Sequence, residues 1–129
     1  MFDCRTASTA ALAYLGDAVL EILVRQRLVE EGLSSSKALN AAALQYVRAG
    51  AQARAMERIL PLLSEEEDAA FRRGRNMGHS SHPKGATVGE YRNATGMEAL
   101  FGYLKMKGEE ARIRALFDAA YPKENTEAR

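Results

Sequence analysis

The chain contains few of the residues that cross-link or interrupt a fold. Its 129 residues include one cysteine, Cys4, three prolines and no tryptophan. A single cysteine excludes an intrachain disulfide and a zinc site made of several thiolates. Scarce proline, together with abundant alanine, leucine and glutamate, favours helices, and the sequence has no alternating strand pattern. We therefore expect an all-α protein.

Long apolar runs are also missing. None is long enough to cross a bilayer, and the start of the chain, MFDCRTAST, has neither the basic start nor the apolar stretch of a signal peptide. These absences predict a cytoplasmic protein. The length fits one domain, which we place at residues 1–121, followed by a tail at residues 122–129 that we expect to be disordered.

Excess positive charge is small overall but concentrated in one segment. The formal net charge is +1, yet residues 72–92 hold five arginine and lysine side chains and a single acidic one, Glu90. The basic residues are Arg72, Arg73, Arg75, Lys84 and Arg92. A basic segment on a nearly neutral protein indicates a surface that faces a polyanion. The alternative is a solvated basic loop without a partner.

Capping residues and apolar spacing divide the chain into five predicted helices. Ser8 and Thr9 can cap the first, and Ser64 with Glu67 has the spacing of a capping box before the third. The glycine-rich stretch between the third and fourth helices predicts a mobile loop. The predicted helices are residues 9–31, the stretch 39–60 with caps at 34–36, a break around Gly50 and its end or a kink near Pro61, a short helix within 64–76, and residues 90–107 and 109–121; the loop covers residues 77–89.

Two carboxylates stand nearly alone inside the two most apolar predicted helices. Asp17 lies in ALAYLGDAVLEILV and Glu98 lies in NATGMEALFGYL. A helix that is apolar around most of its circumference is normally buried, so a carboxylate in it is either neutralised or bound to a cation. From the residues alone, Asp17 is either a structural buried acid or one ligand of a shared ion.

Small residues accompany both carboxylates. Ala13 and Gly16 lie near Asp17, and the later helix has Ala94, Gly96 and Gly102 around Glu98. If the helices cross at these residues, the two carboxylates meet, and Mg²⁺ suits a few carboxylates with places left for water and phosphate. Because the basic segment leads into the helix of Glu98, the pattern predicts metal-assisted hydrolysis of a phosphodiester.

Four sequence blocks resemble the ribonuclease III family. YLGDAVLEILV at residues 14–24 is similar to its signature helix, and ATGMEALFGYL at residues 94–104 is similar to its second catalytic helix. Together with LNAAALQYVRAGAQA and RRGRN, they resemble Mini-ribonuclease III, the short branch made of the catalytic domain only, without a double-stranded-RNA-binding domain. The resemblance covers about residues 11–116, with the blocks in the order of the family.

The resemblance implies an all-α ribonuclease III endonuclease domain that forms a homodimer and cleaves double-stranded RNA with Mg²⁺. Water would attack the phosphodiester and leave 5′-phosphate and 3′-hydroxyl ends. The implied substrate in this branch is the precursor of 23S ribosomal RNA, with a ribosomal protein on the RNA as a further partner. Tyr14 occupies the position of an aromatic residue at the subunit interface.

The resemblance also assigns roles to individual residues. Asp17 and Glu98 correspond to the essential aspartate and glutamate, so we expect both to be catalytic and to hold the metal. Apart from these two carboxylates, the basic side chains of residues 72–92 and one amide in the RRGRN block are expected to bind the RNA backbone. These RNA-binding residues are Arg72, Arg73, Arg75, Asn76, Lys84 and Arg92.

Two positions depart from the family pattern. Longer ribonuclease III enzymes have a glutamate four residues before the signature aspartate and an aspartate three residues before the later glutamate; this chain has Ala13 and Thr95 there. Two of the four expected carboxylates are therefore missing, and the number of metal ions stays open. Thr95 offers a hydroxyl to a metal-bound water, and Glu21, one turn after Asp17, is an alternative ligand.

Other interpretations also stay open. His79 and His82 are three residues apart, but a glycine- and serine-rich loop without further ligands favours solvent exposure or phosphate contact over metal binding. The missing carboxylates leave room for a non-catalytic RNA-binding assembly factor with the same fold. A helical interaction protein that binds no nucleic acid is the third class.

Overall fold

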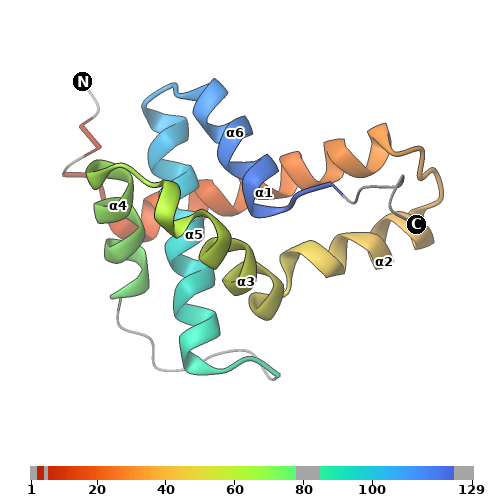
Figure 1. Cartoon of the computed structure of the whole chain (residues 1–129), viewed down its shortest axis with the longest axis horizontal. Coiled ribbons are helices and arrows are strands. Elements are labelled where there is room, and N and C mark those ends of the chain that lie inside the picture. Colours follow the sequence, from red (N-terminus) through yellow and green to blue (C-terminus); the bar gives the residue numbers. More distant parts are fainter. Residues whose placement is uncertain (1–2, 5, 78–84, 124–129) are drawn as a thin grey trace.

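The computed structural model describes residues 3–4, 6–77 and 85–123, and the elements within these ranges are all helices (Figure 1). No helix in these ranges is long and apolar enough to span a membrane. The predicted all-α class is confirmed, whereas most of the predicted tail, 122–129, lies outside the described residues. In chain order the elements are α1 (Thr9–Glu30), α2 (Ser36–Val47), α3 (Ala49–Ile59), the 3₁₀ helix η1 (Leu60–Leu62), α4 (Glu65–Arg75), α5 (Val88–Met106) and α6 (Glu110–Ala120).

The helix starts follow side-chain caps, most of which the sequence predicts. The Ser8 side chain caps α1 by accepting a hydrogen bond from a first-turn amide. Ser64 and Glu67 form both bonds of the predicted capping box at α4. Thr87 and Glu90 form a second capping box at α5, which the sequence analysis missed. That box explains why α5 begins two residues earlier than predicted.

Two of the predicted helix ends at glycine are confirmed, and the predicted break in the second helix lies at a different residue. Gly32 and Gly108 follow α1 and α5 with φ of 94° and 74°, the left-handed conformation that glycine adopts readily. The predicted second helix is divided at Arg48, whose extended backbone separates α2 from α3. The predicted break around Gly50 is therefore confirmed, and it lies two residues earlier, at Arg48. Pro61 lies in η1, where the helix was expected to end.

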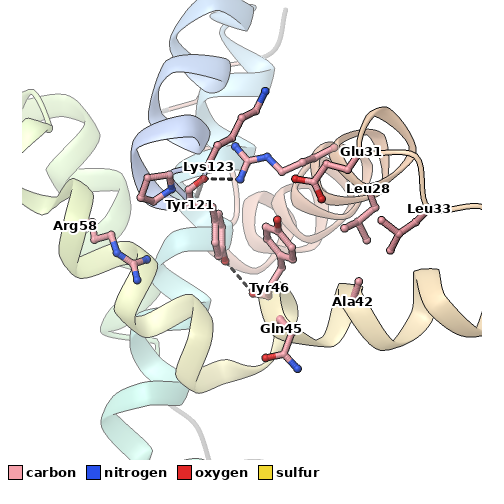
Figure 2. A pocket seen from close by; sticks show the side chains of 11 residues that line it. Leu28, Glu31, Leu33, Ala42, Gln45, Tyr46, Arg58, Tyr121 and Lys123 are labelled. Carbon is pink, nitrogen blue, oxygen red and sulfur yellow. Dashed lines mark hydrogen bonds between the residues drawn. The ribbon is translucent and has the colours of Figure 1, made fainter. Parts of the chain in front are cut away.

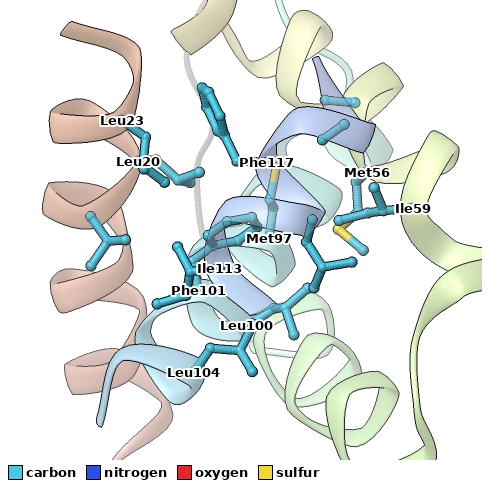
Figure 3. Close-up of a cluster of buried hydrophobic side chains, with 14 of the residues drawn as sticks. Leu20, Leu23, Met56, Ile59, Met97, Leu100, Phe101, Leu104, Ile113 and Phe117 are labelled. Atoms are coloured by element: carbon cyan, nitrogen blue, oxygen red, sulfur yellow. The ribbon is translucent and has the colours of Figure 1, made fainter. Parts of the chain in front are cut away.

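α5 is the central helix of the fold. It packs against α1, α3, α4 and α6 (Figure 1). Buried side chains from α1, α3, α5 and α6 fill the core between them, as Figure 3 shows. Close packing on several sides fixes the position of α5, so a functional side chain on it is rigidly held. The largest fully buried side chains include Phe101, Phe117, Leu20, Met56, Ile59, Met97 and Leu100.

α1 and α5 cross in direct backbone contact. A Cβ atom on Gly16 would lie 1.6 Å from the carbonyl oxygen of Glu98, and one on Gly102 would lie 1.9 Å from the carbonyl oxygen of Leu12. Only glycine allows the two backbones to approach this closely. The predicted crossing at small residues is confirmed for Gly16 and Gly102.

α4 packs on α5 through two further glycines. A Cβ atom on Gly96 would lie 2.6 Å from the ring of Phe71, and one on Gly74 would lie 2.8 Å from the carbonyl oxygen of Thr95. The prediction that Gly96 contributes to the crossing with α1 is wrong, because its close contact is with α4. The last turn of α4 therefore rests on the turn of α5 that precedes Glu98.

Candidate active site

The glycine crossing brings Asp17 of α1 together with Glu98 of α5. A hydrogen bond joins the two carboxyl groups. Burial, the negative charge of Asp17 and the hydrogen bond to Asp17, in decreasing order of effect, together raise the pKa of Glu98 to about 8. At neutral pH, Glu98 therefore holds a proton in most molecules and donates it to Asp17. The predicted meeting of the two carboxylates is confirmed.

The two carboxylates differ in their exposure. Glu98 is half-buried, whereas Asp17 is exposed, so the interpretation of Asp17 as a structural buried acid is wrong. The expectation that α1 is buried around most of its circumference is wrong as well. Tyr14 and Ile22 on this helix are 84% and 64% exposed. Asp17 thus lies where a solvent-borne ion or substrate can reach it.

The carboxylate pair fits a hard divalent cation. A cation that displaces the shared proton would balance both negative charges, and carboxylate oxygens are ligands that Mg²⁺ prefers. Within the described ranges, no group of three or more His, Cys, Asp or Glu side chains is arranged to hold a metal. Asp17 and Glu98 would therefore be the protein's ligands, and water and phosphate oxygens would supply the others.

The positions that lack the expected carboxylates contribute little to this pair. Ala13 is buried, and Thr95 is 7% exposed and donates its hydroxyl proton to the Tyr91 carbonyl oxygen at 3.0 Å. The Thr95 oxygen can still accept a hydrogen bond, so its contact with a metal-bound water stays a prediction. Glu21 pairs with Arg25 at 3.4 Å, which favours a solvated side chain over a metal ligand.

Most of the predicted RNA-binding residues that the structure describes lie on the surface. Arg72 pairs with Asp68 at 2.8 Å, and Arg75 donates to the Asn93 side chain at 3.2 Å. Pairs between exposed side chains are weak, so both arginines can exchange these partners for phosphate. Lys84 falls outside the described residues, as do His79 and His82. The exposed members of the predicted set are Arg72, Arg75, Asn76 and Arg92.

Arg73 differs from its neighbours. It is half-buried, and its guanidinium donates to the carbonyl oxygens of Ala7 and Cys4 at 2.6 and 3.3 Å and to the Thr9 hydroxyl at 3.2 Å. These acceptors belong to the start of α1 and the segment before it. The contact of Arg73 with RNA stays a prediction, but in the folded protein its guanidinium is already hydrogen-bonded to the start of α1 and the segment before it.

A basic hollow that the sequence analysis missed lies where α2 meets α3, beside the start of α5. Its volume is about 640 Å³, and its lining includes Arg48, Arg54 and Glu90 together with Gly85 and Ala86. The two arginines are distant in sequence from the basic segment, so charge clustering along the chain cannot find them. Arg48 lies at the exposed junction of α2 and α3, a position that no local pattern in the sequence marks.

A second cavity, of about 740 Å³, lies near the C-terminal end of α1 and contains none of the predicted site residues (Figure 2). Arg27, 3% exposed, donates to the Tyr121 carbonyl oxygen and to the Asp118 carboxylate, and Arg58 donates to the Ala120 carbonyl oxygen at 2.6 Å. The two arginines thus satisfy carbonyls at the end of α6 that lack helical partners. These hydrogen bonds stabilise the fold, and they account for both arginines without a role in binding.

The chain is similar to known proteins in sequence and in fold. A Mini-ribonuclease 3 of Symbiobacterium thermophilum is 44% identical over 115 residues, which are 89% of this chain and 88% of that protein. A Mini-ribonuclease 3 of Enterococcus faecalis is 40% identical over 120 residues, 92% and 91% of the two chains. A crystal structure of a Fusobacterium nucleatum protein matches with a TM-score of 0.85 at 28% identity and covers 95% of this chain and 100% of that one.

The family model for the ribonuclease III domain matches residues 10–109. The matched region includes the crossing of α1 and α5, both carboxylates and the arginines at the end of α4. The chain therefore belongs to the ribonuclease III family.

Proposed function

We propose that the protein is a metal-dependent endoribonuclease that cleaves double-stranded RNA by attack of water on the phosphodiester, leaving 5′-phosphate and 3′-hydroxyl ends. The observation that carries this proposal is the pair of carboxyl groups joined across the backbone contact of α1 and α5. Nothing in the packing of two apolar helices requires such a pair, which costs stability when both groups are ionised.

Asp17 and Glu98 would hold Mg²⁺. When bound, the ion would supply a more acidic water and stabilise the charge that develops on the phosphate. The role of the chain itself is to place two oxygen ligands on rigid helices, with Asp17 exposed to the substrate and Glu98 half-buried. Metal binding would require Glu98 to lose its proton, so ion affinity would rise with pH up to about 8.

The RNA backbone would be held by exposed arginines around the carboxylate pair. Arg72 and Arg75 end α4, which rests on α5 directly before Glu98, and Arg92 lies on α5 itself. Arg48 and Arg54, beside the start of α5, would extend this basic surface. A single helical domain would read chiefly the shape, phosphates and 2′-hydroxyls of A-form RNA, because the base edges lie in a deep, narrow groove.

We propose that two copies pair through the exposed face of α1. Tyr14, Ile22 and Val29 are 84%, 64% and 64% exposed, and helical spacing places them on one side of the helix. A row of large apolar side chains in water is typical of an interface. A homodimer would place two carboxylate pairs along one RNA duplex.

The proposed biological task is maturation of the 23S ribosomal RNA precursor in the cytoplasm, with a ribosomal protein on the substrate as a further partner. The support for this task is the similarity to proteins named Mini-ribonuclease 3 and the resemblance of the four sequence blocks to that branch. The geometry of the site supports cleavage of duplex RNA in general, and the specific substrate comes from the resemblance.

A non-catalytic RNA-binding factor is the second candidate function. The observation that favours it is the absence of carboxylates at Ala13 and Thr95, which leaves only two acidic ligands at the crossing. This factor would keep the basic surface and the fold, but the carboxylate pair would then have no function that offsets its cost.

One assay separates the two candidates. The protein is incubated with a labelled RNA duplex of about 30 base pairs and with its single strand, each with Mg²⁺ or with EDTA. Nuclease function predicts discrete products from the duplex alone, with 5′-phosphate ends that a phosphatase removes, and no products in EDTA. Salt-dependent binding of the duplex without products in any divalent ion would favour the non-catalytic factor.

A further inference from the structure

Arg73 connects two elements that are otherwise distant in sequence. All three of its guanidinium nitrogens donate hydrogen bonds, to the carbonyl oxygens of Cys4 and Ala7 and to the hydroxyl of Thr9. A planar guanidinium can serve three acceptors in fixed directions, whereas an ammonium on a flexible stem cannot hold the same geometry. The last turn of α4 is therefore tied to the start of α1.

The same turn of α4 is also seated on α5. Gly74 lies so close to α5 that a Cβ atom there would be 2.8 Å from the Thr95 carbonyl oxygen and 2.9 Å from the Cα of Gly96. Thr95 is one helical turn before Glu98, and Thr9 is about two turns before Asp17. Consecutive residues at the end of α4 thus contact the two helices that carry the carboxylate pair, Arg73 on one side and Gly74 on the other.

The arginines on either side of this contact face solvent. Arg72 and Arg75 are exposed, and among the described residues they contact the side chains of Asp68 and Asn93, whereas Arg73 is half-buried against neutral oxygens. For Arg73 to reach a phosphate, it would have to release three hydrogen bonds to the N-terminal segment. Arg72 and Arg75 would release one weak partner each.

We propose that Arg73 is a positioning residue rather than an RNA ligand: by holding the N-terminal segment against α4, it fixes Arg72 and Arg75 relative to Asp17 and Glu98. This inference rests on the proposed function, since the positioned arginines act on RNA phosphates. A bound duplex would keep its affinity without the Arg73 contact, but the phosphate to be cleaved would be misplaced relative to the carboxylate pair.

Three variants test this proposal against a direct phosphate contact. Arg73→Lys keeps the charge and loses the geometry, Thr9→Val removes one acceptor and leaves Arg73 itself intact, and Arg75→Ala removes an exposed arginine as the reference for a phosphate contact. Each variant is measured for duplex RNA binding over a range of salt concentrations, for kcat and KM with Mg²⁺, and for hydrogen exchange at residues 7–12 without RNA.

We expect Arg73→Lys to lower kcat by about tenfold at saturating RNA. The salt slope, meaning the dependence of the logarithm of RNA affinity on the logarithm of salt concentration, should stay unchanged. Thr9→Val should lower kcat by less and also leave the salt slope unchanged. Amide exchange at the start of α1 should accelerate about tenfold or more in both variants. Arg75→Ala should instead reduce the salt slope by about one unit and leave that exchange unchanged.

The proposal is overturned if Arg73→Lys retains kcat and normal exchange, since a point charge suffices for a phosphate contact. It is also overturned if Thr9→Val behaves like the wild type in both kcat and exchange. Failure of the proposed function has a different signature: the wild-type protein would not cut duplex RNA, whether or not it binds it, while exchange at residues 7–12 would still respond to Arg73→Lys.

Discussion

Replacing Glu98 by Gln should stabilise the metal-free protein in a pH-dependent way. Because the pKa of Glu98 is raised in the folded protein, Glu98 keeps its proton between about pH 4.5 and 8, where the unfolded chain has released it. The stability of the wild type therefore falls as the pH rises through this window and levels off above it. Glutamine is neutral at every pH and can still donate a hydrogen bond to Asp17, so the variant escapes this loss.

The size of the effect follows from the difference between the two pKa values. A group with a pKa of 4.5 in the unfolded chain and about 8 in the folded protein costs about 3 kcal/mol at pH 7, and the cost approaches about 5 kcal/mol above pH 8. For a chain of this length, 3 kcal/mol corresponds to an increase in melting temperature of roughly 10 °C. At pH 5 the two proteins should differ by less than about 1 kcal/mol.

The assay is denaturant unfolding of the wild type and Glu98→Gln from pH 5 to 9 in EDTA. Glu57→Gln, an exposed glutamate on α3, serves as the matched control and should follow the wild type at all pH values. Added Mg²⁺ should stabilise the wild type at pH 8 and leave Glu98→Gln nearly unchanged, because the ion binds the ionised pair. A stability difference between wild type and Glu98→Gln that is constant with pH would contradict a raised pKa at Glu98.

Three further substitutions test the helix crossing and the proposed dimer. Gly16→Ala should destabilise the protein by about 3 kcal/mol or more, since its Cβ would lie 1.6 Å from the Glu98 carbonyl oxygen, while Gly89→Ala, with nothing nearer than 3.9 Å, should be neutral or stabilising by up to about 1 kcal/mol. Chemical denaturation compares the two, and equal effects would contradict the backbone contact. Tyr14→Arg should convert a dimer into a folded monomer in analytical ultracentrifugation, because Tyr14 is 84% exposed and takes no part in the core. A Tyr14→Arg protein that keeps the dimer mass would place the interface elsewhere.

Local sequence rules account for most of the helix boundaries. Ser8, Ser64 and Gly32 act within a turn of the helix ends that they define, so their roles are visible without tertiary information. Arg48 is different, because a break at an arginine has no local signature. The nearby Gly50 was the stronger local breaker, and the packing of α3 against α5 favours a helix that continues through it.

In the candidate site, too, some features follow from local sequence and others depend on tertiary packing. Asp17 and Glu98 are predictable because a carboxylate in an apolar helix is locally anomalous, and the family resemblance names both. The exposure of Asp17 and the hydrogen bonds of Arg73 depend on which faces of α1 and α4 are covered, and three-dimensional packing decides this. A basic segment therefore predicts a surface for a polyanion more reliably than it predicts which arginine contacts it.

The most direct test of the account is the cleavage rate of duplex RNA under single-turnover conditions, for the wild type and Asp17→Asn over a range of Mg²⁺ concentrations. We predict that Asp17→Asn lowers the rate by roughly a thousandfold or more at saturating Mg²⁺, while the affinity for the duplex in EDTA stays within about threefold of the wild type. Cleavage by Asp17→Asn at the wild-type rate would contradict the claim that the carboxylate pair between α1 and α5 is the catalytic centre.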